Sequence, residues 1–305
     1  GRSPGMRTVF KMIGSVATTR TNVLIQGESG TGKELVAKAI HYNSPSRDEP
    51  FIVINCSAIS DTLLESELFG HVKGAFTDAI SETRGKFEIA GKGTLFLDEV
   101  GDVSPNLQSK LLRVIETRDF MKVGGEKVLK TEARIIAATN QNLRALIDKG
   151  RFREDLYYRL KVVEITLPPL RERREDIPEL VAYLLEKIDR DIRKNVRKVP
   201  PDVMKYVADL PWRGNVRELE NALTRAVILA KGDVVLKENL PPDPEEKLPF
   251  PNELVTLEVV EKNYIQHVLT AVKGSKTRAS QILQISRPTL DKKIKDYGLD
   301  VGDAG

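Results

Sequence analysis

The chain has 305 residues and is poor in the residue types that build disulfides, zinc sites and membrane helices. Its single cysteine, Cys56, excludes an internal disulfide, and the apolar run before it predicts a buried thiol rather than a reactive one. The histidines, His41, His71 and His267, are scattered without ligand spacing, so we expect no zinc site. No apolar run approaches the roughly 20 residues that span a bilayer, and no signal peptide is visible. We therefore expect a cytoplasmic protein with no membrane partner, and an N-terminal portion before Gly1 because the chain does not begin with Met.

The net charge is only +4, but the basic residues are unevenly distributed. The segment Lys273–Lys295 holds seven basic residues and one acid, Asp291, so it carries +6 and the rest of the chain −2. A basic patch on a near-neutral body suggests a polyanionic partner at that end of the chain. The alternative is a solvated helix face, and charge alone leaves both interpretations open.

Five short apolar runs predict strands, and helical patterns lie between them. The runs are Val23–Gln26, Phe51–Asn55, Thr94–Asp98, Arg134–Thr139 and Val162–Thr166. Strands that alternate with helices are typical of a mainly parallel sheet covered on both faces. We therefore predict an α/β fold, with ligands beyond the carboxyl ends of its strands.

Only helical patterns follow the proline-containing segment Leu167–Leu170, which predicts a separate helical subdomain. The segment Leu240–Leu254 contains five prolines and little periodicity, as a linker does. The predicted domains are an α/β subdomain over residues 1–168, a helical subdomain over 169–240, a linker over 241–254 and a small all-α domain over 255–305.

A glycine-rich loop joins the first predicted strand to a helical pattern, with the sequence Gly27-Glu28-Ser29-Gly30-Thr31-Gly32-Lys33-Glu34. Its glycines let backbone N–H groups turn toward an anion, and the helix N-terminus adds partial positive charge. Lys33 places a cation where the β- and γ-phosphates of a nucleotide would lie. Glu34 stands where the generic pattern has a Ser or Thr that helps to hold Mg²⁺. Other groups must therefore supply more of the metal ligands.

Acidic residues follow the third predicted strand, at Asp98 and Glu99. Beside a phosphate loop, we expect Asp98 to hold Mg²⁺ and Glu99 to accept a proton from the attacking water or to orient it. The two motifs together predict nucleotide hydrolysis. Thr139 and Asn140 end the next strand, where they either hydrogen-bond the γ-phosphate or the water, or simply cap the strand.

Two further segments are rich in basic residues. Arg153 and Arg159 lie on one predicted helix but six residues apart, about 240° around it, so they cannot serve one point from one face; surface charge is the plain interpretation. Near the C-terminus, Lys276–Leu283 and Arg287–Tyr297 predict two short helices joined by a tight turn, the second one basic. This pattern indicates a DNA-binding helix-turn-helix, and a generic helical bundle is the alternative.

These motifs resemble the central and C-terminal domains of sigma-54-dependent transcriptional activators, the NtrC-like bacterial enhancer-binding proteins. The resemblance covers essentially the whole chain. The glycine loop resembles their Walker A motif, including Glu34, and Gly93–Glu99 resembles their Walker B motif. Residues 65–71 and 74–79 resemble the segment that contacts sigma-54, residues 152–159 the arginine-finger region, 212–219 the sensor II motif and 285–299 a Fis-type DNA-binding domain.

The resemblance implies a AAA+ ATPase with a helical lid that uses ATP and Mg²⁺ and works as a homo-oligomeric ring, taken to be a hexamer, with a dimer as an inactive form. It implies sigma-54 RNA polymerase holoenzyme and enhancer double-stranded DNA as partners, and promoter opening as the outcome. A receiver or sensor domain, as in two-component systems, usually precedes a segment like Gly1–Pro4 in this family.

The resemblance also implies roles for individual residues. Asn55 matches a switch residue that holds Glu99, and Thr139 and Asn140 match sensor I. Arg153 and Arg159 match residues that reach the neighbouring subunit's nucleotide. The remaining implied contacts are Gly27, Glu28, Ser29, Gly30, Thr31, Gly32, Lys33, Glu34 and Arg217 to the nucleotide, Asp98 to Mg²⁺, Gly74, Ala75, Phe76, Thr77, Asp78 and Ala79 to sigma-54, and Ser286, Arg287, Thr289, Lys292 and Lys293 to DNA. Residues 118–130 match a hairpin beside the Phe76 loop.

Two positions depart from the family pattern. Asp78 replaces a glycine that the sigma-54-contacting loop usually has, and Gln284 replaces a common glycine, so we expect it at positive φ. Two rival functions follow from the same motifs. One is a different AAA+ machine, such as a clamp loader or an unfoldase, and the other is a DNA-binding regulator whose ATPase no longer remodels a partner.

Overall fold

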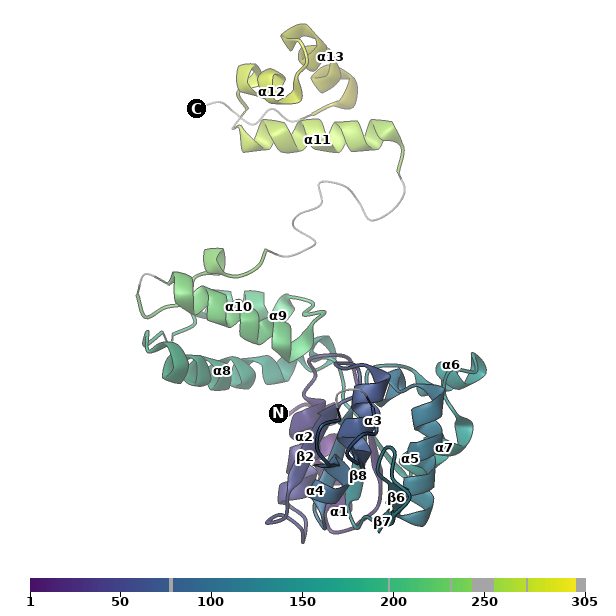
Figure 1. Cartoon of the computed structure of the whole chain (residues 1–305). Coiled ribbons are helices and arrows are strands. Elements are labelled where there is room, and N and C mark those ends of the chain that lie inside the picture. The colour runs from purple at the N-terminus through teal and green to yellow at the C-terminus, as the bar shows by residue number, and fades with distance from the viewer. Residues whose placement is uncertain (77–78, 197, 231, 243–254, 273, 300–305) are drawn as a thin grey trace. The chain divides into compact units, whose positions relative to one another are not determined.

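A computed structural model describes the chain except for residues 77–78, 197, 231, 243–254, 273 and 300–305 (Figure 1). The chain divides into two compact units, Gly1–Leu240 and Pro241–Gly305. The first unit contains a parallel sheet and a group of helices, and the described part of the second contains three helices.

The first unit is built on a five-stranded sheet in the order β2-β5-β8-β1-β9. Every pair of neighbouring strands is parallel. The strands are β1 (Val23–Gln26), β2 (Phe51–Asn55), β5 (Thr94–Asp98), β8 (Arg134–Thr139) and β9 (Val163–Thr166). The predicted α/β fold is therefore confirmed, and β9 begins one residue later than the sequence pattern indicates.

Alternate residues of the strands enter two hydrophobic cores, one on each face of the sheet. Leu24, Leu95 and Leu97 belong to one core, whereas Val23 and Phe96 belong to the other. The first core includes side chains of α3 (Asp61–Phe69), α5 (Pro105–Thr117) and α7 (Glu154–Leu160), and the second those of α1 (Pro4–Ala17) and α2 (Lys33–Tyr42). Helices thus cover both faces, as the near-continuous apolar strands predict.

Short elements extend the unit beside α3 and α5. The two residues of β3 (Gly70–His71) pair antiparallel with β4 (Thr83–Arg84), and β6 (Asp119–Met121) pairs antiparallel with β7 (Val128–Lys130). This second pair is the hairpin expected over residues 118–130, and Gly124 takes a φ of 72° within its turn. The other short elements are α4 (Lys86–Ala90), α6 (Leu143–Asp148) and the 3₁₀ turn Val100–Asp102.

The C-terminal part of the first unit is a helical subdomain with its own core. Its helices are α8 (Ile177–Ile192), α9 (Pro201–Asp209) and α10 (Asn215–Leu229), which pack beside one another in Figure 1. Short 3₁₀ turns lie at Leu170–Glu172, Arg174–Asp176 and Lys237–Asn239. Trp212 is buried in this core, and its indole N–H donates to the Val207 carbonyl at 2.7 Å. That bond fixes the turn before α10, which faces the glycine loop.

The second unit contains α11 (Leu257–Ala271), α12 (Lys276–Leu283) and α13 (Arg287–Tyr297). Its small core includes Ile265, Ala279 and Leu290, one residue from each helix. Gln284 ends α12 with a φ of 55°, so the expectation of a positive φ is confirmed. Ser286 caps α13 by accepting the N–H of Thr289 at 3.3 Å. Two short helices joined at a left-handed residue form the expected helix-turn-helix.

Candidate nucleotide-binding site

The glycine loop, the acidic end of β5 and the first turn of α10 enclose one cleft of about 550 Å³. The side chains and backbone that line it are those of Ser29, Gly30, Gly32, Lys33, Glu34, Leu35, Asn55, Ser57, Asp98, Glu99, Asp102, Asn140, Val216, Arg217 and Glu220. The structure therefore brings together most of the residues that the sequence nominates for the nucleotide. The cleft opens beyond the carboxyl ends of the strands, where parallel sheets bind ligands.

Lys33 is the cation of the cleft and is only 7% exposed. Its ammonium group donates to the Gly27 carbonyl at 3.1 Å and to Glu99 Oε1 at 3.3 Å. The helix α2 begins at Lys33, after Gly32 at a φ of 102°, a conformation that favours glycine. The loop thus turns so that a buried cation and a helix N-terminus face the same space, as anion binding requires.

Asp98 and Glu99 place two carboxylates beside this cation. Burial, together with the charge of Glu99, raises the pKa of Asp98, and Lys33 only partly offsets this. Two adjacent carboxylates and one ammonium leave an excess of negative charge, which a divalent cation would relieve. Glu99 takes a left-handed φ of 52°, which directs the chain into the turn after β5.

The two oxygens of Glu99 have different partners. Oε1 pairs with Lys33, and Oε2 accepts the backbone N–H of Asn140 at 3.0 Å. Asn55 also lines the cleft, but its amide oxygen accepts from the backbone and hydroxyl of Ser57 at 2.9 and 2.8 Å. Among the described residues, no hydrogen bond joins Asn55 to Glu99. The predicted switch contact is therefore absent here, and Lys33 and Asn140 hold the glutamate instead.

Arg153 and Arg159 lie outside the cleft, and their exposed side chains contact α5. Arg153 precedes α7 as its N-cap and pairs with Asp155 at 2.7 Å, and Arg159 pairs with Glu116 at 2.9 Å. The side chains of Arg153 and Arg159 are 46% and 60% exposed. They do not meet at one point within the chain, in agreement with the sequence argument. Exposed ion pairs are worth about 0–1 kcal/mol, so both arginines can exchange partners at little cost.

Gln108 is a residue that the sequence analysis overlooks. It is fully buried on α5, and its amide donates to the carbonyls of Val103 and Arg151 at 2.8 and 3.0 Å. Its Oε1 accepts the backbone N–H of Arg153 at 2.8 Å. A buried side chain therefore fixes the turn that presents Arg153. Arg151 and Arg153 lie 43 and 45 residues from Gln108, so no local signal reveals the role.

The helical subdomain contacts the glycine loop at several points. Arg217, the sensor II candidate, donates to Ser29 Oγ at 3.3 Å and remains exposed at the rim of the cleft. Glu28 does not extend freely into the cleft, because Arg171 holds its carboxylate through two hydrogen bonds of 2.6 and 2.8 Å. Glu34 pairs with Lys38 one turn along α2, at 2.7 Å. Glu28 and Glu34 are therefore both neutralised by neighbouring cations.

The loop between β3 and β4 carries the candidate sigma-54 contacts. It closes as a turn in which Ala79 N–H donates to the Phe76 carbonyl at 3.0 Å and Gly74 N–H donates to the Ala79 carbonyl at 2.8 Å. The Phe76 ring packs edge-on against the His71 ring at 4.9 Å and is half-buried. It is thus neither fully exposed nor part of either hydrophobic core of the sheet. Thr77 and Asp78 lie outside the described residues.

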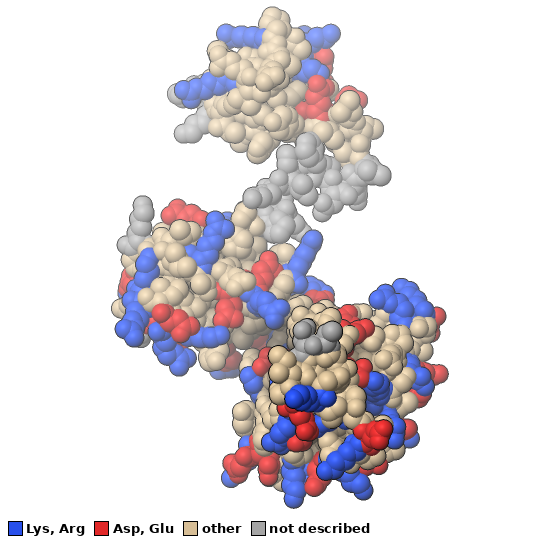
Figure 2. Space-filling model, viewed as in Figure 1, with Lys and Arg blue, Asp and Glu red and all other residues tan. Residues whose placement is uncertain are grey.

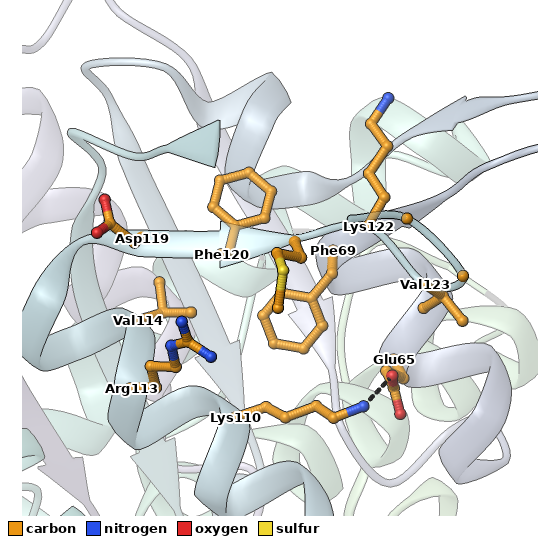
Figure 3. A pocket seen from close by; sticks show the side chains of 12 residues that line it. Glu65, Phe69, Lys110, Arg113, Val114, Asp119, Phe120, Lys122 and Val123 are labelled. Atoms are coloured by element: carbon orange, nitrogen blue, oxygen red, sulfur yellow. Dashed lines mark hydrogen bonds and ion pairs between the residues drawn. The ribbon is translucent and has the colours of Figure 1, made fainter. Parts of the chain in front are cut away.

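A second cavity of about 340 Å³ lies between α3, α5 and the β6–β7 hairpin. Figure 3 shows Phe69 and Phe120 in its middle and Lys110 bonded to Glu65 at one side. It shares no lining residue with the nucleotide cleft. The hairpin also meets β3, where Val123 N–H donates to the Gly70 carbonyl at 2.8 Å. The hairpin and the Phe76 loop therefore form one connected surface region.

The second unit carries the candidate DNA-binding residues. Figure 2 shows its Lys and Arg side chains at the upper and left edges and its Asp and Glu side chains at the right. Arg287, Thr289 and Lys292 are exposed on α13. Lys293 instead pairs with Glu261 of α11 at 2.6 Å and is half-buried. This pair holds two helices together, so Lys293 is less available to a partner than Lys292.

Two other sequence expectations can be checked directly. Cys56 is 3% exposed, and burial raises the pKa of its thiol to about 12, which confirms an unreactive buried thiol. None of the helices within the described ranges has the length and apolar character needed to cross a membrane.

Comparison with known families matches three consecutive parts of the chain. The sigma-54 interaction domain matches residues 1–166, the AAA+ ATPase lid domain residues 171–254 and the Fis family of bacterial regulatory proteins residues 256–297. Among curated proteins, regulatory protein AtoC of Escherichia coli is 44% identical over 99% of this chain and 68% of its own length. The Nif-specific regulatory protein of Herbaspirillum seropedicae is 52% identical over 77% of this chain and 43% of its own length.

Solved structures give the same result. NtrX from Brucella abortus, solved in complex with ATP and with ADP, is 36% identical and has a TM-score of 0.75 over 98% of this chain and 69% of the NtrX chain. Hsp104 with ATPγS, at 17% identity and a TM-score of 0.51, supports the fold alone. The α/β subdomain, the helical subdomain and the helix-turn-helix unit described above correspond in turn to these three family models. The chain therefore belongs to the sigma-54-dependent activators, with an AAA+ ATPase domain, its lid and a Fis-type DNA-binding domain.

Proposed function

We propose that this ATPase assembles as a ring on enhancer DNA and uses ATP hydrolysis to remodel sigma-54 RNA polymerase holoenzyme, so that the promoter opens. The observation that carries the proposal is the convergence of Lys33, Asp98, Glu99 and Arg217 on one cleft beside a glycine loop. A cation, two carboxylates and an arginine from the lid supply the groups that phosphoryl transfer to water needs. Since bacterial DNA and its polymerase lie in the cytoplasm, the proposal places the protein there.

In the proposed reaction, Lys33 leaves Glu99 and pairs with the β- and γ-phosphates of ATP. Glu99 is then free to orient the attacking water while it still accepts the Asn140 N–H. Lys33 and Glu99 thus pair with each other until ATP binds. Arg217 reaches the phosphates from the lid, and Thr139 and Asn140 lie at the end of the neighbouring strand.

The residues present fit a magnesium ion. Asp98 is a half-buried carboxylate whose pKa is raised by burial and by Glu99, as expected for a group that lacks a sufficient counter-charge. Asp98 would hold Mg²⁺, with phosphate oxygens and waters completing its shell. Mg²⁺ would neutralise the charge that develops on the phosphates. Glu34 has no hydroxyl group to offer the metal, and its carboxylate pairs with Lys38. Asp98 would therefore be the side chain that holds Mg²⁺.

Replacement of Phe76 with Ala tests the proposed contact with sigma-54. The ring is half-buried against His71, outside both cores, so the variant should keep its fold and its basal ATPase activity. We expect it to lose complex formation with purified sigma-54 in the presence of an ATP transition-state analogue, because one aromatic anchor often dominates an interface. Phe10→Ala, which removes an aromatic ring 48% exposed on α1, is the matched control. Wild-type binding by the Phe76 variant would mean that another surface couples the ATPase to its partner.

Separate replacement of Lys292 and Lys293 with Ala tests DNA binding by the second unit. Lys292 is exposed, whereas Lys293 pairs with Glu261. We expect Lys292→Ala to weaken binding to all duplex sequences alike and to lower the slope of log affinity against log salt by about one. Lys293→Ala should lower the slope less. Arg287, near the N-terminus of α13, is the candidate for base contact, so its variant should lose discrimination between sequences. Unchanged salt slopes in both lysine variants would place the DNA interface elsewhere.

A further inference from the structure

The carboxylate of Glu28 connects the glycine loop to the lid. Arg171 donates to Oε1 at 2.6 Å and to Oε2 at 2.8 Å, and Asn215 Nδ2 donates to Oε2 at 3.1 Å. These bonds, first to Arg171 and then to Asn215, lower the pKa of Glu28 to about 2. A lowered pKa makes the ion pair fully present above the ordinary carboxylate value and lost only as the pH falls toward 2. The connection is therefore intact throughout the neutral pH range.

Asn215 joins three segments from a fully buried position. Its Oδ1 accepts the backbone N–H of Leu170 at 2.7 Å, and its Nδ2 also donates to the Ser29 carbonyl at 3.0 Å. Its φ of 55° is one that asparagine tolerates better than most residues. The side chain thus ties the start of the helical subdomain, the glycine loop and the start of α10 to one another.

Backbone contacts extend the same connection. Val216 N–H donates to the Gly30 carbonyl at 3.0 Å, and a Cβ atom at Gly30 would lie 2.3 Å from the Gly214 carbonyl oxygen. Arg173, which is 5% exposed, donates to the Thr31 carbonyl at 3.0 Å. With Arg217 on Ser29, each of the four loop positions 28–31 touches the lid. The glycine loop and the lid are therefore held together at all four of these positions.

An unpaired carboxylate in a phosphate-binding loop would repel the nucleotide, and Arg171 removes that repulsion. We propose that Arg171 and Asn215 are positioning residues of the ATPase, which hold Glu28 and the glycine loop against the lid and thereby slow nucleotide release. This role requires only nucleotide binding by the ATPase domain and does not depend on sigma-54 or DNA. The lid can then open only when the Glu28 connection breaks.

The test measures dissociation of a fluorescent ADP by stopped flow, and KM and kcat for ATP, with the whole chain and without sigma-54. Arg171→Ala should release ADP about tenfold faster and raise KM about tenfold while changing kcat less than about twofold, because it removes binding rather than chemistry. Arg171→Lys keeps the charge but loses the two-pronged geometry, so its effect should be intermediate. The ratio of variant to wild-type release rates should be constant from about pH 6 to 9, since Glu28 stays ionised.

A double-mutant cycle shows whether Glu28 and Arg171 act through one shared interaction or independently of each other. The double variant should release ADP no faster than Arg171→Ala alone, because Glu28→Gln and Arg171→Ala break the same interaction and the double variant also lacks the unpaired carboxylate. Arg174→Ala is the matched control, since this exposed arginine of the same segment pairs with Asp209 at 3.7 Å rather than with Glu28. Should Arg171→Ala fail to fold, the nearly isosteric Glu28→Gln variant carries the test. Additive effects, unchanged release rates, or a loss of kcat in Glu28→Gln alone would overturn the proposal, the last because Glu28 would then act on the substrate directly.

Discussion

Glu99→Gln is expected to bind ATP as the wild type does and to hydrolyse it about 10²–10⁴-fold more slowly, the usual contribution of a general base. The amide can still accept the Asn140 N–H, but it cannot take a proton from water or pair with Lys33. ATP binding is followed by fluorescence titration and hydrolysis by phosphate release. Asp102→Asn is the matched control, because Asp102 lines the same cleft and hydrogen-bonds Gln141 rather than Lys33; its hydrolysis rate should remain near wild type.

Lys33→Ala gives the complementary result. It removes the buried cation that faces the phosphates, so ATP binding itself should be lost. Lys33→Ala is therefore expected to lose ATP binding, whereas Glu99→Gln is expected to bind ATP and to lose hydrolysis. An equal loss of ATP affinity in Glu99→Gln and Lys33→Ala would contradict the assignment of separate roles to these residues.

Removal of an arginine that, by the family resemblance, would reach the neighbouring subunit is expected to lower hydrolysis by about 10³–10⁵-fold with ATP binding intact. Arg153→Ala and Arg159→Ala are the two candidates, since both side chains are exposed and form ion pairs at the surface. Hydrolysis rate is measured against protein concentration, which should show a steep dependence for the wild type because the site is completed by assembly. Arg151→Ala, an exposed arginine two residues before Arg153, is the control and should hydrolyse ATP normally.

Mixing experiments test whether the arginine acts in trans. A subunit with Lys33→Ala still presents its arginines, and a subunit with Arg159→Ala still has an intact cleft. Mixed assemblies should therefore regain part of the activity that each variant lacks alone. A hydrolysis rate per subunit that is independent of protein concentration, or no recovery on mixing, would show that the arginines serve only surface ion pairs.

The elements of the fold could be read from the sequence because their signals are local. Each strand of the sheet is a short apolar run, and the glycine loop is defined by spacing alone, so β1 and the start of α2 lie where the pattern places them. The same holds for α13, which spans Arg287–Tyr297 as its pattern predicts. The helix α1 lies outside the predicted elements, although Ser3 and Pro4 are typical start signals of a helix.

The partners of the side chains could not be predicted in the same way. Glu28 and Arg171 are 143 residues apart, and Asn215 is 187 residues from Glu28. Glu99 has Lys33 and Asn140 as partners where the family resemblance implies Asn55. Such pairings depend on which strand ends and turns the topology brings together, and no periodicity or spacing within a segment encodes them. The sequence therefore nominates the residues of the cleft, and the structure determines which of them act on one another.

Promoter opening is the measurement that tests the central claim most directly. The whole chain is added to sigma-54 holoenzyme bound at a promoter linked to an enhancer, and single-stranded DNA at the start site is detected with permanganate. The account predicts opening with ATP and Mg²⁺, and none with a non-hydrolysable ATP analogue or with Glu99→Gln. Opening with the analogue would contradict the claim that hydrolysis drives remodelling. Rapid ATP hydrolysis without any opening would also contradict it, because the ATPase would then not act on the sigma-54 holoenzyme.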